Sequence, residues 1–296
     1  MLQFLADQAI PVCVFFLMLV AGTEISRADF SRLSQNTRVV LLGSAGQLLA
    51  LPPIALAIIA VSSPPSTIAA GLIILSLSPN GGISNSYCYL ARCNVLLSAT
   101  ITAVGTALCL VTIPAWLTLI PSARDFNVVL LEVPSRTVVT QLLVLMILPI
   151  GIGGLVRREY PKWTASATKA LRWLSIGFVA IILASAVATV GANLSELMLS
   201  IVMTAALFII AAMTVGWLFG RGLNDRDRPV LAIEAGVRNV GVALLLGRTV
   251  VAPETFGALA SFITGYFIVE VVIMLPYAHC QARRSSVETA KFPNSN

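Results

Sequence analysis

The residues LMLSIVMTAALFIIAAMTVGWLFG, numbers 197–220, contain no charged side chain and no proline. A run of this length is sufficient for a helix that crosses about 30 Å of hydrocarbon. Residues 39–61 form another uncharged run. Because lipid offers the backbone no hydrogen-bond partner, a spanning segment must be a helix or part of a closed barrel. The runs are unbroken rather than alternating, which excludes a barrel, so the sequence predicts an all-α polytopic membrane protein.

The composition of the 296 residues supports this class, since 57% are hydrophobic and only 11% are charged. A soluble domain carries about 25% charged residues. We interpret the net charge of +6 as a signal of membrane topology rather than of nucleic-acid binding. The five cysteines are scattered and suggest neither a zinc site nor a disulfide framework. With His279 as the only histidine and no nucleophile–base pair, we expect no enzyme.

We expect nine spans along the chain, of which residues 197–220 form the seventh. Their approximate bounds are 2–22, 39–61, 66–92, 95–120, 137–156, 173–190, 197–220, 229–247 and 256–278. The polar residues 282–296 are expected to form a disordered cytoplasmic tail.

The basic residues predict the orientation of these spans. Of the 19 Lys and Arg residues, Arg124, Arg136 and Arg248 fall in one set of loops, Arg238 lies within a span, and the remaining 15 fall in the other set. Cytoplasmic loops carry the excess of Lys and Arg. We therefore expect the N-terminus outside and the C-terminus in the cytoplasm, with the protein in a bacterial inner (cytoplasmic) membrane.

Two predicted spans contain an interruption. Residues 78–85 read SPNGGISN and residues 234–241 read EAGVRNVG. Proline removes a helical donor and glycine favours unwinding. Glycine and proline are frequent in membrane helices anyway. However, the two segments run in opposite directions in the two halves of the chain, and such pairs indicate the site of an inverted-repeat transporter.

Ionisable side chains at membrane depth are the strongest functional signal. A carboxylate such as Glu234 costs about 2.5 kcal/mol or more near the bilayer centre unless it is paired, solvated or ion-bound. A bound cation is one candidate partner, and Arg238, one helical turn later, is the other. Glu270 lies inside the ninth span, either as a second ion or proton site or as a partner of Arg238.

Neutral oxygens near the interruptions suit a hard cation such as Na⁺. The side chains in question are Ser84, Asn85, Ser98 and Thr102. Ser98 and Thr102 are four residues apart and share a helix face, although bonding back to a helix carbonyl is the alternative for these two. Gln47 and Gln141 are lone amides in apolar spans, which more often form interhelical hydrogen bonds than bind ligands.

These segments resemble the bile acid:sodium symporter family over almost the whole chain. PNGGISN at 79–85 carries the resemblance, together with EAGVRN at 234–239, similar to E-x-G-x-Q-N, and QLLALP at 47–52, similar to Q-x-x-x-M-P. The resemblance implies a core domain, a panel domain and two broken helices that cross at the ion sites. It implies the nine-helix form, with residues 1–120 as an incomplete first repeat (spans 1–4) and 121–281 as the second (spans 5–9).

The resemblance also implies ligand sets. One Na⁺ site would use Ser84, Asn85, Ser98, Thr102 and Glu234. A second would use Gln47, Glu234 and the position of Arg238, where the family has glutamine. Arg has only donors and stays charged, so it cannot bind Na⁺ but can occupy the place of one. We therefore expect one Na⁺ site.

The remaining candidates concern the substrate. Gly82, Asn239, Glu270 and Arg238 are the residues expected to contact it or to supply the built-in cation. Gly82 stands where relatives often have Ser or Thr, so one hydroxyl contact is absent and the substrate need not be a bile acid. Arg238 has an alternative role as a bidentate clamp on a substrate carboxylate.

The leading hypothesis is a secondary symporter that moves a small organic anion with Na⁺ by alternating access. Half-helix N-termini and Arg238 would supply the positive field. One alternative is a Na⁺-independent or proton-coupled carrier in which Arg238 replaces a cation. Another is a non-transporting membrane receptor or sensor. The expected partners are the organic anion and the lipid bilayer, with no nucleic acid and no obligatory protein partner.

Overall fold

The computed structural model describes residues 10–24, 37–120, 134–162, 164, 170, 177 and 194–291. Every regular element within these residues is a helix, as the sequence predicts. Six helices among them are long and apolar enough to cross a membrane: 37–62, 95–119, 135–159, 197–219, 228–250 and 256–284. Two shorter apolar helices cover 10–23 and 66–77. The predicted sixth span, 173–190, lies outside the described residues except for one position, residue 177.

The first part of the chain contains α2 (Ile10–Glu24) and a continuous second span. That span consists of α4 (Thr37–Leu41), a π-helical turn η2 (Leu42–Gly46) and α5 (Gln47–Ser62). It is followed by α6 (Ser66–Leu77), α7 (Ile83–Leu90) and α8 (Val95–Leu119).

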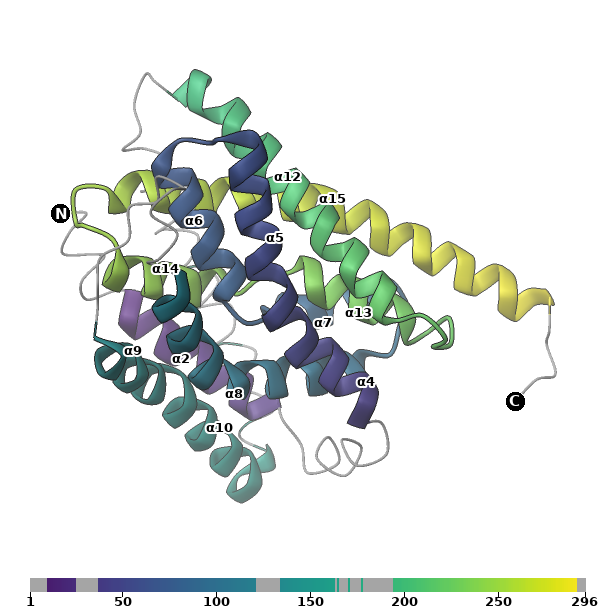
Figure 1. Cartoon of the computed structure of the whole chain (residues 1–296). Helices are drawn as coiled ribbons and strands as arrows, with labels where there is room; N and C mark the ends of the chain where they lie inside the picture. The colour runs from purple at the N-terminus through teal and green to yellow at the C-terminus, as the bar shows by residue number, and fades with distance from the viewer. Residues whose placement is uncertain are drawn as a thin grey trace.

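The second part begins with one span made of α9 (Ser135–Leu142), the π-helical turn η5 (Leu143–Ile147) and α10 (Leu148–Glu159). It continues with α12 (Leu194–Phe219), α13 (Arg228–Gly236), α14 (Val240–Val250) and α15 (Phe256–Lys291). α15 leaves the bundle at its C-terminal end (Figure 1). Residues 282–291, expected to begin a disordered tail, instead continue this helix, since no Gly or Pro occurs there to end it.

Both predicted interruptions are present and lie inside the bundle. α6 ends at Leu77 and α7 begins at Ile83, while α13 ends at Gly236 and α14 begins at Val240. Nearly all of residues 228–250 are buried by the surrounding helices. α13 packs against α12, α7 and α8, and α14 packs against α15, α6 and α2 (Figure 1). The second interruption is therefore shielded by other helices, as non-helical backbone at membrane depth must be.

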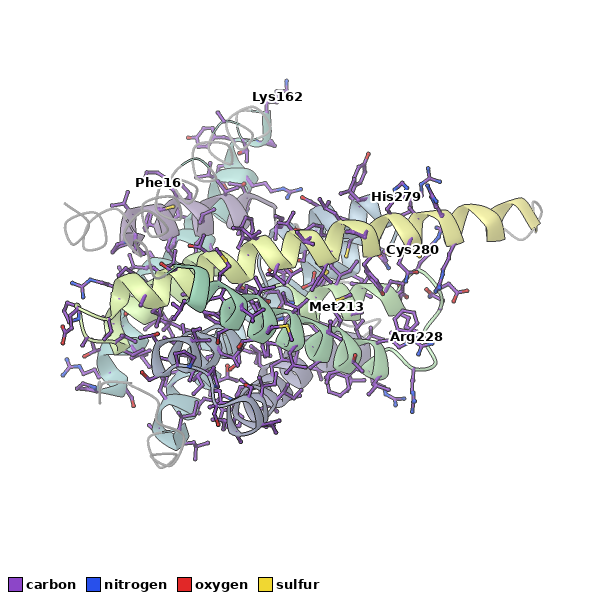
Figure 2. All side chains as sticks on the ribbon, turned by 90° about the horizontal axis from the view of Figure 1, so that it is seen from above. Phe16, Lys162, Met213, Arg228, His279 and Cys280 are labelled. Atoms are coloured by element: carbon purple, nitrogen blue, oxygen red, sulfur yellow. The ribbon has the colours of Figure 1, made fainter. Side chains whose placement is uncertain are left out.

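Contacts between loops show which helix ends lie together. The Asn94 amide N–H donates to the Arg226 carbonyl oxygen at 3.1 Å, and Asn94 Nδ2 donates to Asp227 Oδ1 at 2.8 Å. Arg157 Nη1 donates to the Thr23 carbonyl oxygen at 2.9 Å. Thus the loops after the third and seventh predicted spans meet, and the ends of the first and fifth predicted spans meet. Figure 2 shows Arg228 and the outer stretch of α15, with His279 and Cys280, towards one end of the molecule.

The α2–α10 pair is held by backbone approach at glycines. A Cβ added at Gly153 would lie 2.2 Å from the Leu19 carbonyl oxygen, and one added at Gly22 would lie 2.2 Å from the Ile150 carbonyl oxygen. Small residues permit such close packing of membrane helices.

We expect Gly153→Ala to destabilise the protein by about 1–3 kcal/mol, because the added methyl must push α2 and α10 apart. Gly151→Ala, in the same helix, is the control, since its Cβ would meet no atom within 4 Å. Thermal unfolding in detergent measures both. Equal midpoints for the two variants would contradict the packing described here.

Candidate ion site at the helix crossing

The two interrupted spans cross at their breaks. The Asn239 amide N–H donates to the Pro79 carbonyl oxygen at 2.8 Å. A Cβ added at Gly81 would lie 3.1 Å from the Arg238 carbonyl oxygen, so glycine allows this close approach. The Asn239 side chain accepts a hydrogen bond from the Val242 amide N–H at 3.1 Å and caps α14. The crossing therefore brings residues 78–85 and 234–239 into one polar centre.

Glu234 lies at this centre and is completely buried. Its Oε1 accepts from Ser98 Oγ, and its Oε2 accepts from Asn80 Nδ2 and, at 3.0 Å, from Thr102 Oγ1. No ion pair joins its carboxylate to a cation within the described residues. The salt bridge considered as an alternative is thus not formed, and the hydrogen bonds to the carboxylate come from neutral donors.

Four more side-chain oxygens lie close to the carboxylate of Glu234. Ser98 Oγ lies 2.7 Å from Asn85 Oδ1 and also contacts Glu234 Oε1, but a hydroxyl can donate only once. Ser84 Oγ lies 3.5 Å from Thr102 Oγ1. The structure therefore brings together all of Ser84, Asn85, Ser98, Thr102 and Glu234. One carboxylate among several neutral oxygens suits a hard monovalent cation.

Arg238 lies beside this shell, with 1% of its surface exposed. Its Nη2 donates to Gln47 Oε1 at 2.6 Å and to the Glu234 carbonyl oxygen at 2.5 Å. Its Nη1 donates to the Ser78 carbonyl oxygen at 3.2 Å. The sequence offered the carboxylates of Glu234 and Glu270 as candidate partners of Arg238, whereas the structure supplies an amide and two backbone carbonyls to the guanidinium. Arg238 is thus surrounded by the neutral oxygens that a metal cation would also use.

Gln47, which contacts Arg238, directly follows the π-helical turn η2. Its Nε2 donates to the Gly43 carbonyl oxygen and, at 2.9 Å, to Asn80 Oδ1. π-helical turns are frequent at functional sites, but the sequence of residues 42–46 carried no signal for one. Asn80 was likewise not predicted to contact Glu234. Its only signal is a polar amide in the motif PNGG, inside an otherwise apolar span.

Glu270 is completely buried on α15 but does not contact the Arg238 guanidinium. Its Oε2 accepts from the Arg238 backbone N–H at 3.4 Å, and its Oε1 has no partner.

Gly82 is exposed beside the crossing, and a Cβ there would meet no atom within 4 Å. Gln141 lies elsewhere, where its Oε1 accepts from Thr249 Oγ1 at 2.7 Å. A cavity of about 830 Å³ opens there, lined by α9 and η5 residues including Arg136.

The chain is similar to known membrane transporters. Residues 11–197 match the model of the sodium bile acid symporter family. A rice (Oryza sativa subsp. japonica) protein, "Probable sodium/metabolite cotransporter BASS2, chloroplastic", is 24% identical over 84% of this chain and 58% of its own length. "Uncharacterized sodium-dependent transporter YocS" of Bacillus subtilis (strain 168) is 28% identical over 82% of this chain and 75% of its own. "Probable sodium/metabolite cotransporter BASS1, chloroplastic" of Arabidopsis thaliana is 25% identical over 77% and 56%. The chain therefore spans little more than half the length of the two plant relatives.

Proposed function

The chain belongs to the sodium bile acid symporter family, and from this premise we propose that it moves a small organic anion across the membrane together with one Na⁺. The observation that carries the proposal is the convergence of Ser84, Asn85, Ser98, Thr102 and Glu234 in one shell. One carboxylate and several neutral oxygens match the charge and hardness of Na⁺. The names of the relatives, sodium-dependent transporter and sodium/metabolite cotransporter, agree with this ion.

Arg238 takes the place of a second cation in this proposal. Its guanidinium contacts Gln47 Oε1 and the carbonyl oxygens of Ser78 and Glu234, and it is almost fully buried. A clamp on a substrate carboxylate would instead point its donors into an accessible space. The contacts therefore favour the built-in cation over the clamp.

The positive charge and the helix N-termini at the crossing favour an anionic substrate. Arg238 contributes a fixed charge there, and the N-termini of α7 and α14 add their dipoles. The exposed position of Gly82, with open space around it, leaves room for the substrate next to α7.

Alternating access would arise from two inverted repeats, residues 1–120 and 121–281. The helices around the crossing, α5–α8 and α12–α15, would form the core domain, and α2 with α9–α10 would belong to the panel. The N-terminus would lie outside and the C-terminus in the cytoplasm of a bacterial inner membrane, as the distribution of basic residues indicates.

Ligand-induced thermal stabilisation in detergent, followed by uptake into proteoliposomes, tests the proposed function. We expect Na⁺, but not choline, to raise the unfolding midpoint, because an ion that binds the folded state stabilises it by mass action. A panel of organic anions should add stabilisation only in Na⁺, and the stabilising anion should then accumulate in the vesicles. Equal midpoints in Na⁺ and choline would overturn Na⁺ coupling, and binding without accumulation would indicate a receptor.

Proton-coupled transport is the second candidate, and Glu270 is the observation that favours it. This buried carboxylate has one oxygen without any partner, which a proton would neutralise. In that case a pH gradient should drive uptake in choline, and Glu270→Gln should abolish that uptake.

A further inference from the structure

Four buried side chains form a continuous hydrogen-bond chain between the two charges at the crossing. Arg238 Nη2 donates to Gln47 Oε1 at 2.6 Å, Gln47 Nε2 donates to Asn80 Oδ1 at 2.9 Å, and Asn80 Nδ2 donates to Glu234 Oε2. None of the four side chains is more than 1% exposed. The guanidinium and the carboxylate are therefore connected through two neutral amides and not by direct contact.

Every link of this chain donates in the same direction, from the cation to the anion. Each amide turns its oxygen towards Arg238 and its NH₂ group towards Glu234, which is the orientation that both charges stabilise. If either amide were flipped, its NH₂ group would face a donor and its oxygen would face an acceptor. Hydrogen bonds in series polarise one another in a low-dielectric interior, so the charge of Arg238 is felt at Glu234 through Gln47 and Asn80.

The surroundings of Asn80 are shaped to hold its amide. A Cβ added at Gly105 of α8 would lie 3.2 Å from Asn80 Oδ1, so only glycine leaves this amide its full space. Gln47 is fixed as well, because its Nε2 also donates to the Gly43 carbonyl oxygen in the π-helical turn. Both amides are thus held by groups that do not belong to the ion shell.

We propose that Asn80 is a positioning residue that transmits the positive charge of Arg238 to Glu234 and so lowers the affinity of the Glu234 site for Na⁺. The inference rests on the proposed function. Its physical basis is that the Asn80 donor stabilises the cation-free carboxylate, which competes with ion binding. The consequence for transport is that Na⁺ is held loosely enough to be released on the far side.

The test uses the full-length protein and Na⁺ alone as the probe. The Na⁺ concentration that gives half of the maximal thermal stabilisation is measured with choline held as the balancing ion. Asn80→Gly removes the donor, and we expect the half-saturating concentration to fall about fivefold, because part of the hydrogen bond from Asn80 to the charged carboxylate is lost when the ion binds. Gly105→Ala, which displaces the Asn80 amide without touching the ion shell, should shift the value in the same direction by a smaller factor.

Ser76→Ala is the matched control. Ser76 is buried one turn before Asn80 in the same span, but its hydroxyl donates to the Ile73 carbonyl oxygen of its own helix at 2.6 Å. We expect the half-saturating Na⁺ concentration of Ser76→Ala to equal that of the unmodified protein. If the role of Asn80 were purely structural, Asn80→Gly and Gly105→Ala would lower stability but would also leave this concentration unchanged.

A double-mutant cycle between Asn80→Gly and Arg238→Met provides the decisive readout, because methionine removes the charge and supplies no oxygen for a second Na⁺. Transmission through Asn80 predicts that Arg238→Met changes the half-saturating Na⁺ concentration at least about threefold less in the Asn80→Gly background, because the effects of changes within one hydrogen-bond network are not additive. Additive effects of the two changes in the cycle would overturn this inference and leave the proposed function standing. The same holds for an unchanged half-saturating concentration in both Asn80→Gly and Gly105→Ala. Absence of any Na⁺ response in the unmodified protein would overturn the proposed function with it.

Discussion

Glu234→Gln should abolish both Na⁺-dependent uptake and Na⁺-dependent stabilisation. Glutamine keeps the shape of the side chain and removes the only formal negative charge from the shell of Ser84, Asn85, Ser98 and Thr102. Two unit charges about 4 Å apart attract by about 4 kcal/mol at an effective dielectric constant near 20, which corresponds to about a thousandfold loss of Na⁺ affinity. The ratio of initial uptake rates in Na⁺ and in choline measures the effect.

Glu270→Gln is the informative comparison, because it makes the same chemical change in the other carboxylate buried near the crossing. The Na⁺-coupled account predicts that this variant keeps the Na⁺ dependence of the unmodified protein. Retained Na⁺ dependence in Glu234→Gln would show that the shell around Glu234 does not bind the coupling ion.

Arg238→Gln should change the shape of the Na⁺ curve. Glutamine supplies an acceptor oxygen where Arg238 has only donors, beside Gln47 Oε1 and the carbonyl oxygens of Ser78 and Glu234. A second Na⁺ can then bind in the place of the guanidinium, so uptake plotted against Na⁺ concentration should become sigmoidal.

Arg238→Ala should instead be inactive and unstable, because it removes the donors from three buried oxygens. An unsatisfied buried acceptor costs about 1–3 kcal/mol. The clamp hypothesis predicts a different pattern: Arg238→Gln would raise the anion concentration for half-maximal uptake and leave the shape of the Na⁺ curve unchanged. Measuring both curves on the same proteoliposomes distinguishes the two roles.

The sequence predicted the features of this fold that depend on local chemistry. Pro79 with Gly81 and Gly82 indicated the first interruption, and Gly236 beside two charges at membrane depth indicated the second; the structure has both. The residues Ser84, Asn85, Ser98, Thr102 and Glu234 were proposed as one set from the resemblance and from their oxygens, and they do lie together. Their role in binding Na⁺ stays a prediction.

The features that the sequence could not supply depend on the packing of distant segments. The direction of an amide such as that of Asn80 is determined only when Gln47 and Glu234, 33 and 154 residues away, are placed around it. The sequence offers carboxylates as partners of Arg238 because charge pairing is visible in a sequence, whereas backbone carbonyls exposed by a helix break are not. The π-helical turn before Gln47 has no composition of its own.

The Na⁺-to-substrate flux ratio of the unmodified protein tests the central claim most directly. Once a transported anion is identified, the initial fluxes of radiolabelled Na⁺ and anion are measured in the same proteoliposomes, together with the dependence of uptake on Na⁺ concentration. One Na⁺ bound at Glu234, with Arg238 in place of the other, predicts a ratio of one and a hyperbolic curve. A ratio of two with a sigmoidal curve would contradict the account, because it would require a second Na⁺ where the guanidinium of Arg238 lies.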